Sequence, residues 1–137
     1  TSVQRAGTPP RVVEVADGDA GHYVAELAHI ADAAAGEEGL TAIVAADAAR
    51  ANWLSKQLGE RVQLVDRNSL MPASGVMLMD LRLAKGLEFD HVVVPDAQAE
   101  VYPDTPLARR RLYTAISRAM HEVTIVSQGA LTPLLAR

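Results

Sequence analysis

Apolar residues are grouped along the chain in alternating blocks of two kinds. Short runs rich in Val, Ile, Leu and Ala are typical of buried strands, and longer segments repeat their apolar residues at helical spacing. The short runs predict strands over 11–15, 41–45, 62–65, 76–81, 91–94 and 123–126. The longer segments predict helices over 20–35, 48–58, 106–120 and 131–136. Such alternation predicts an α/β fold, with helices on both faces of a mostly parallel sheet.

Polar and glycine residues at the ends of these segments support the boundaries. Asp47 is well placed to cap the second helix, and Gly36 and Gly59 follow the predicted ends of the first two helices. The opening stretch contains glycine and a pair of prolines, which predicts an irregular lead-in over 1–10. The remaining residues, 11–137, are then expected to form one domain.

The composition limits the possible functions. The net charge of −4 gives no general attraction to nucleic acid, so any such contact must be local. The chain lacks cysteine and its four histidines show no metal-ligand spacing, so no metal site is predicted. No apolar run approaches the roughly 20 residues of a membrane span, and no signal peptide opens the chain. A cytoplasmic, monomeric protein without membrane contact is therefore expected.

The segment 83–90 separates two predicted strands and carries possible ligand-binding groups. We expect it at the carboxyl end of a strand, where open α/β sheets bind ligands. Lys85 offers a cation, Glu88 an acceptor, and Gly86 a backbone that tolerates positive φ or close approach. A polar crossover loop with incidental charges explains the same residues equally well.

Arginines border the apolar face of the predicted helix 106–120. Arg111 and Arg118 lie seven residues apart on one edge of that face. A half-desolvated guanidinium there would bind a phosphate strongly. Taken alone, this helix is better explained as a solvated basic face with its side-chain stems on apolar surface.

The two segments together resemble motifs V and VI of UvrD/Rep-like superfamily 1 helicases. Residues 84–89 read AKGLEF, the usual motif V, and 113–119 contain the Tyr and the Ser-Arg-Ala of motif VI. The resemblance covers most of the chain. It implies the second RecA-like domain of such a helicase, a three-layer sandwich related to P-loop NTPases.

The resemblance also implies a nucleotide-binding role for several residues. Arg118 matches the arginine finger that reaches the γ-phosphate of ATP, where charge builds up in the transition state. Glu88 matches the residue that contacts the ribose, and Gly86 belongs to the same loop. Tyr113 and Arg110 match positions that support the finger.

Two further features bear on what the motor acts on. Lys85 lies in the loop that couples the nucleotide cleft to nucleic acid, and Arg82 replaces a histidine that often contacts DNA in this family. Fewer than 20 residues separate 58 from 76, where UvrD and Rep insert a large subdomain. This short stretch and the wording of 83–97 and 113–123 are most similar to the HelD branch, whose members remodel or recycle RNA polymerase.

The chain lacks the parts that would make an ATP site by itself. It has no Gly-x-x-x-x-Gly-Lys-Ser/Thr loop and no strand that ends in an Asp-Glu pair for Mg²⁺. We therefore expect ATP and Mg²⁺ to bind only with an N-terminal RecA-like domain of the same polypeptide, and the isolated chain to be inactive. DNA, RNA polymerase or both are the expected partners. A half-domain of a DNA-unwinding helicase and a degenerate protein-binding module remain as alternatives.

A few other residues invite weaker interpretations. Trp53 is expected in the core or at its boundary rather than as an exposed docking residue. His91 and His121 lie at the starts of strands and are expected either at the surface or just behind a functional site. Asp80, Ser117 and His121 could form a hydrolytic triad, but no Gly-x-Ser-x-Gly turn accompanies them.

Overall fold

The computed structural model describes residues 10–69, 72 and 74–135, and these residues contain one six-stranded sheet. The strand order is β1-β6-β5-β2-β4-β3, and every neighbouring pair is parallel. The strands are β1 (Arg11–Val15), β2 (Leu40–Ala45), β3 (Gln63–Leu64), β4 (Gly75–Asp80), β5 (Phe89–Val94) and β6 (Ala119–Gln128). The α/β class is confirmed, and the sheet is wholly parallel. The predicted lead-in lies outside the described residues, except for Pro10.

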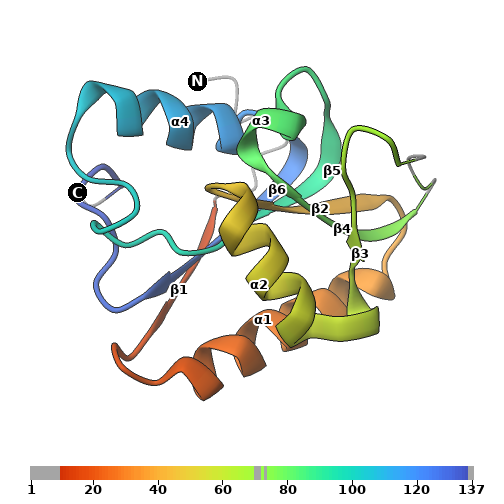
Figure 1. Cartoon of the computed structure of the whole chain (residues 1–137), viewed down its shortest axis with the longest axis horizontal. Coiled ribbons are helices and arrows are strands. Elements are labelled where there is room, and N and C mark those ends of the chain that lie inside the picture. Colours follow the sequence, from red (N-terminus) through yellow and green to blue (C-terminus); the bar gives the residue numbers. More distant parts are fainter. Residues whose placement is uncertain (1–9, 70–71, 73, 136–137) are drawn as a thin grey trace.

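The helices form two layers, one on each face of the sheet (Figure 1). They are α1 (Ala20–Ala35), α2 (Ala48–Leu58), the single turn α3 (Leu81–Ala84) and α4 (Pro106–Ile116), with a 3₁₀ turn η2 (Gly59–Arg61). α1 and α2 cover one face, and α3 and α4 cover the other. None of the described helices is both long and apolar enough to cross a membrane.

Successive strand residues point into two different cores. Ile43 and Val93 pack with α1 and α2, whereas Val44 and Val92 pack with α3 and α4. All four side chains are fully buried. Because both faces of a central strand are covered, these strands read as continuous apolar runs rather than as alternating ones.

Side-chain caps fix where two of the helices begin. Asp47 Oδ1 accepts a hydrogen bond from the backbone N–H of Arg50 at 2.9 Å, as predicted for the start of α2. Thr105 Oγ1 accepts from the N–H of Ala108 at 3.1 Å, and Pro106 occupies the first turn of α4. Both helices therefore begin at the carboxyl edge of the sheet.

The prediction that the last long helix continues to residue 120 is wrong. α4 ends at Ile116, and the N–H groups of Ser117 and Arg118 close its last turn on the carbonyls of Tyr113 and Ala115. The carbonyl of Arg118 then accepts from Phe89 N–H at 2.9 Å, which begins the pairing of β6 with β5. Arg118 consequently lies between α4 and β6, and its place on a helical edge shared with Arg111 is also wrong.

The predicted final helix over 131–136 is not present in its described part, 131–135. Leu131 instead forms an isolated antiparallel bridge with Gln98, and the Thr132 hydroxyl donates to the carbonyl of Tyr102 at 2.5 Å. These contacts tie the segment to the loop after β5. The short apolar run is therefore explained by packing on that loop rather than by helical periodicity.

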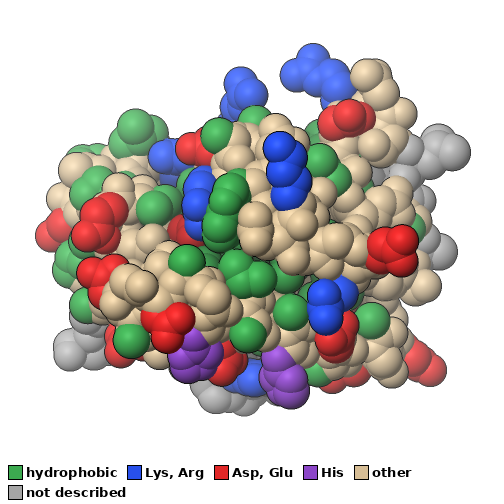
Figure 2. Space-filling model, turned by 60° about the horizontal axis from the view of Figure 1, so that its bottom comes forward, with side chains coloured by type: hydrophobic (Ala, Val, Ile, Leu, Met, Phe, Trp, Pro, Cys, Tyr) green, Lys and Arg blue, Asp and Glu red, His purple; other side chains and the backbone are tan. Residues whose placement is uncertain are grey.

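The surface carries charges of both signs. Figure 2 shows acidic and basic side chains intermixed on the face turned to the viewer. This distribution agrees with the small net charge of −4. Any attraction for a polyanion must therefore arise at a particular concavity rather than over a whole face.

Candidate functional site

The loop 85–88 runs from α3 back to the amino end of β5. β4 ends at Asp80, and β5 begins at Phe89. Because the two strands are parallel, the chain between them must return to the other edge of the sheet. The segment 83–90, expected at a carboxyl end, therefore only begins there: Leu83 and Lys85 line a cavity at the carboxyl edge, and the residues that follow return to the amino edge. Gly86 has φ +85, so the predicted left-handed turn is present.

Arg118 lies against this loop. Its Nη1 donates to the carbonyl oxygen of Leu87 at 3.4 Å, and its own carbonyl accepts from Phe89 N–H at 2.9 Å. The two segments that resemble motifs V and VI are therefore joined by both main-chain and side-chain contacts. They meet at the amino ends of β5 and β6, on the face covered by α4.

The guanidinium of Arg118 retains donors that the described residues do not use. Its Nη2 makes a long contact of 3.3 Å with Ser117 Oγ, and its buried Nε has no hydrogen-bond partner among the described residues. The side chain as a whole is partly buried. Buried donors are nearly always paired, so the orphaned Nε is unusual. The donors able to reach an acceptor outside the chain are those of Nη1 and Nη2, whose contacts within the described residues are long, at 3.4 and 3.3 Å. The planar guanidinium has the geometry that phosphate oxygens require.

Three other residues expected at a nucleotide lie in the open. Glu88 and Arg110 are exposed, and Tyr113 is 57% exposed. The Glu88 and Arg110 side chains form no hydrogen bond or ion pair with any other described residue. The structure brings Gly86 and Glu88 into one loop beside Arg118. It places Arg110 and Tyr113 on α4 without a side-chain hydrogen bond to Arg118.

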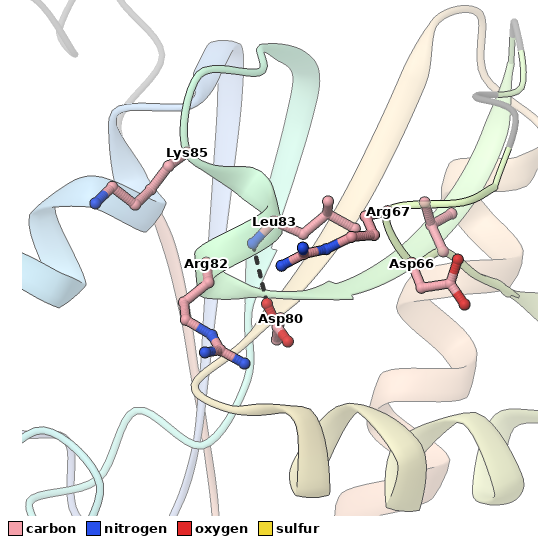
Figure 3. A pocket seen from close by; sticks show the side chains of 7 residues that line it. Asp66, Arg67, Asp80, Arg82, Leu83 and Lys85 are labelled. Carbon is pink, nitrogen blue, oxygen red and sulfur yellow. Dashed lines mark hydrogen bonds between the residues drawn. The ribbon is translucent and has the colours of Figure 1, made fainter.

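A cavity of about 440 Å³ opens at the carboxyl edge, beside the end of β4 (Figure 3). It is lined by Val65, Asp66, Arg67, Asp80, Arg82, Leu83 and Lys85. Asp80 Oδ1 accepts from Leu83 N–H at 3.0 Å and so fixes the start of α3, which carries Arg82. Arg67 and Arg82 extend into the space near Asp80, whereas Lys85 points away from them.

The three cations of this cavity are available to a ligand. Arg67, Arg82 and Lys85 are exposed, and their side chains form no hydrogen bond or ion pair within the described part of the chain. The expected pair, Arg82 and Lys85, is thus brought to one concavity. Arg67 was not predicted, because it stands in an irregular connector whose position relative to α3 no local pattern reveals.

Arg111 has a structural contact. Its Nη2 donates to the carbonyl oxygen of Ala46 at 2.6 Å, which ties the middle of α4 to the end of β2. This bond gives a hydrogen-bond donor to the Ala46 carbonyl, which lies just after the last residue of β2. Arg111 therefore does not share the surroundings of Arg118.

A buried polar network after β5 was not predicted from the sequence. Asp96 is 1% exposed and adopts φ 60. Its carboxylate accepts from Arg50 Nε at 3.0 Å, from Arg50 Nη2 at 2.9 Å and from the Tyr23 hydroxyl at 2.7 Å. Burial, followed by the negative charge of Asp96, raises the pKa of Tyr23 above its ordinary value. Tyr23, Arg50 and Asp96 lie in three segments far apart in the sequence, so the network could not be predicted before the fold was known.

The remaining expectations have mixed outcomes. Trp53 is partly buried with the Arg50 guanidinium 4.4 Å from its ring centre, which confirms a boundary position. His91 is buried, so it does not lie at the surface, and its other expected position, just behind a functional site, stays a prediction. The triad of Asp80, Ser117 and His121 is not formed: Asp80 caps α3, Ser117 Oγ donates to the Thr114 carbonyl and His121 lies 3.7 Å from Asp90.

Comparisons with known proteins place this geometry in context. The family described as the UvrD-like helicase C-terminal domain matches residues 75–126, which contain both segments. The C-terminal domain of a possible DNA helicase from Lactobacillus plantarum WCFS1 is 39% identical and superposes with a TM-score of 0.83, over 99% of this chain and 85% of that one. No curated protein matches the chain.

Two more distant structures share the fold alone. The UvsW helicase from bacteriophage T4 superposes with a TM-score of 0.54 at 8% identity, over 91% of this chain and 49% of that one. A CRISPR-associated protein superposes with a TM-score of 0.52 at 16% identity, over 89% of this chain and 17% of that one. The sheet and its two helical layers are thus those of helicase RecA-like domains.

Proposed function

The chain belongs to the family of UvrD-like helicase C-terminal domains, and we propose that it completes an ATP site shared with an N-terminal RecA-like domain of the same polypeptide. The observation that supports this proposal is the position of Arg118 beside the Gly86 turn. Its guanidinium contacts the Leu87 carbonyl through Nη1 and Ser117 Oγ through Nη2, both at long distances of 3.4 and 3.3 Å. Such a group has donors to spare for an anion presented from outside this domain.

Arg118 would act as an arginine finger. ATP with Mg²⁺ supplies a phosphoryl group whose transfer to water places negative charge on the phosphate oxygens. Arg118 would donate to those oxygens, and the desolvated side of its guanidinium would strengthen the interaction. Glu88 would accept from a ribose hydroxyl, and Tyr113 and Arg110 would line the approach. The chain has no phosphate loop or Mg²⁺-binding acid pair, so those parts would come from the other domain.

The experiment that tests this proposal is ATP turnover by the whole protein with Arg118→Ala. We expect a loss on the order of 10³-fold or more, as for arginine fingers elsewhere, with ATP binding largely retained. Arg109→Ala is the matched control, because Arg109 is exposed and its one ion pair within the described part of the chain is with exposed Asp104. Turnover at the level of the unchanged protein in Arg118→Ala would remove the site assignment. The isolated chain is expected to show no ATPase activity.

A nucleic-acid contact is proposed at the carboxyl edge. The cavity offers a phosphate backbone the unpaired guanidinium groups of Arg67 and Arg82, and Lys85 lies at its margin with its ammonium group directed away from them. α3 and the following loop connect Arg82 to Gly86 within four residues. If this segment moved on nucleotide binding, both the Gly86 turn beside Arg118 and the cavity lined by Arg82 would change. This would explain the coupling role expected of Lys85.

What the whole motor acts on is a separate proposal. The Lactobacillus plantarum protein is described as a possible DNA helicase, which supports DNA as the partner. The connection from α2 to β4 spans only residues 59–74, with η2 and β3 in its described part, so it holds no inserted subdomain. This compactness supports the HelD-like function expected first from the sequence, in which RNA polymerase is remodelled or recycled, and a DNA-unwinding helicase is the alternative. Capture of RNA polymerase by the whole protein, compared with binding to duplex DNA, separates the two.

A protein-binding module without ATPase activity is the remaining alternative. It predicts that Arg118→Ala leaves partner capture unchanged and that the unchanged protein does not hydrolyse ATP. Measurable, Arg118-dependent turnover by the whole protein excludes that alternative.

A further inference from the structure

His91 occupies an unusual position at the amino ends of β5 and β6. It lies on the face of the sheet covered by α1, opposite the face that carries Arg118 and α4. Its side chain is 9% exposed, yet its Nδ1 is buried without a hydrogen-bond partner among the described residues. An unpaired buried nitrogen of this kind requires an explanation, because such atoms are normally satisfied.

The other ring nitrogen is already engaged. Nε2 lies 2.8 Å from Thr124 Oγ1, on the neighbouring strand β6. In the tautomer that donates from Nε2 to this hydroxyl, Nδ1 carries a lone pair directed away from Thr124. Metal-binding histidines commonly have this arrangement, with one nitrogen held by a hydrogen bond and the other free to coordinate. Burial is the main cause that lowers the pKa of His91, which favours the neutral ring.

Two carboxylates stand next to the free nitrogen. Glu122 Oε1 is 3.9 Å from His91 Nδ1, and a donor oxygen of Glu37, from the loop after α1, completes a group whose atoms all lie within 4.8 Å of one another. Bonds of about 2.0–2.1 Å to a tetrahedral ion place its ligands roughly 3.4 Å apart. Because Glu37 and Glu122 are largely exposed, rotation of their side chains can close this difference.

The loop that carries Glu37 is fixed near the strands. Asp90 Oδ2 accepts from Leu40 N–H at 2.8 Å. Gly39 has φ +100, and a Cβ there would meet Asp90 Oδ2 at 2.6 Å, so this close approach requires glycine. Glu37 is therefore held two residues from an anchored turn, while His91 and Glu122 are paired directly in the β5–β6 register.

We propose that His91 Nδ1, Glu37 and Glu122 form a binding site for a divalent transition-metal ion, with Zn²⁺ as the best match. One imidazole with two carboxylates is a donor set that suits Zn²⁺ rather than the all-oxygen preference of Mg²⁺ or Ca²⁺. Three protein ligands leave a fourth position for water. The bound ion joins the loop after α1 to β5 and β6, so it stabilises the amino edge of the sheet.

The surrounding charges favour a cation only moderately. Glu38, Asp90 and His121 line a cavity of about 190 Å³ with the three ligands. Arg11 lines an adjoining cavity and reduces the local negative charge. Binding therefore depends on coordination by the three ligands rather than on a diffuse acidic field. This inference is independent of the proposed ATP site.

The test is titration of the chelator-treated chain with Zn²⁺, followed by calorimetry and thermal unfolding. We expect one saturable Zn²⁺ per chain and a higher Tm in its presence. Glu37→Gln and Glu122→Gln each abolish saturable binding, and both sites are exposed enough to leave the fold intact. Thr124→Val, which removes the hydroxyl that orients His91, weakens binding about 10-fold or more.

Glu26→Gln is the matched control. Glu26 forms a surface pair with His22, at 3.5 Å, so its substitution removes the same charge beside a histidine elsewhere on the chain. It is expected to leave Zn²⁺ binding unchanged. The proposal is overturned if no saturable binding occurs, if binding survives in Glu37→Gln and Glu122→Gln, or if it depends on His121→Gln but not on His91→Gln.

Discussion

The guanidinium of Arg118 and the carbonyl of Leu87 are 3.4 Å apart, although 31 residues separate them in sequence. The carbonyl of Arg118 also accepts from the amide that follows Glu88, so the contact is supported by the main chain. Gly86 directly precedes Leu87 and sets the direction of that carbonyl through its left-handed φ. The turn at Gly86 and the orientation of Arg118 are therefore one structural unit.

Gly86→Ala is expected to strain this unit. A Cβ at this position meets nothing within 4 Å, so the cost is the positive φ itself, about 1–2 kcal/mol of unfolding free energy. Gly21→Ala is the control, because Gly21 lies in α1 with similar open space and an ordinary φ. That change should stabilise the chain by about 0.5–1 kcal/mol. Urea unfolding measures both, and equal effects of the two changes would contradict the argument.

Much of the fold follows from local patterns in the sequence. Buried strands such as β2 are continuous apolar runs, and α2 begins at its predicted cap Asp47. The end of α4 was not predictable in this way. Apolar and polar spacing continues past Ile116 as if the helix went on, but pairing with Phe89 converts Ala119 and the following residues into β6. A long-range strand contact overrides the local period there.

The candidate site was predictable only where its residues lie in recognisable segments. Gly86 and Arg118 belong to such segments, and their proximity follows from the motif order. Arg67 lies outside them, and His91 and Asp96 follow motif V without matching one of its positions. The contacts of all three residues join separate strands and loops. Such contacts depend on sheet order, with β5 between β2 and β6, and no spacing rule along the chain encodes that order.

Asp96→Asn is expected to be strongly destabilising. The carboxylate is buried and receives three side-chain hydrogen bonds, so its neutralisation leaves the partly buried Arg50 without its counter-charge. We expect a loss of about 2–3 kcal/mol of unfolding free energy. Asp104→Asn removes an exposed ion pair with Arg109 and should cost at most about 1 kcal/mol. If denaturant unfolding gave both variants similar losses of unfolding free energy, the buried network would stabilise the fold no more than an exposed ion pair does.

Tyr102→Phe is expected to alter the response of the chain to alkaline pH. Burial raises the pKa of Tyr102 from 10 to about 12. The folded state therefore keeps the proton more tightly than the unfolded state. Its contribution to stability is complete below pH 10 and is lost as the pH rises from 10 through about 12.

The hydroxyl of Tyr102 has no hydrogen-bond partner among the described residues, so its removal should change stability little at pH 7. Between pH 10 and 12 the decline in unfolding free energy should become shallower, by up to about 1.4 kcal/mol per pH unit. Urea unfolding over this range measures the slope. An unchanged slope in Tyr102→Phe would mean that the phenol is not protected by burial.

Arg82→Gln and Lys85→Gln are expected to weaken nucleic-acid binding by the whole protein in a salt-dependent manner. Both cations line the carboxyl-edge cavity without partners among the described residues, and Arg67 is the one other cation among its lining residues. Each lost phosphate contact should reduce the slope of log affinity against log salt by about 0.7 for a single strand and about 0.9 for duplex. Arg109→Gln is the control, because its guanidinium lies on α4 in an exposed pair with Asp104. If all three variants give the same slope as the unchanged protein, the cavity does not hold the phosphate backbone, and the nucleic-acid path must run elsewhere on the motor.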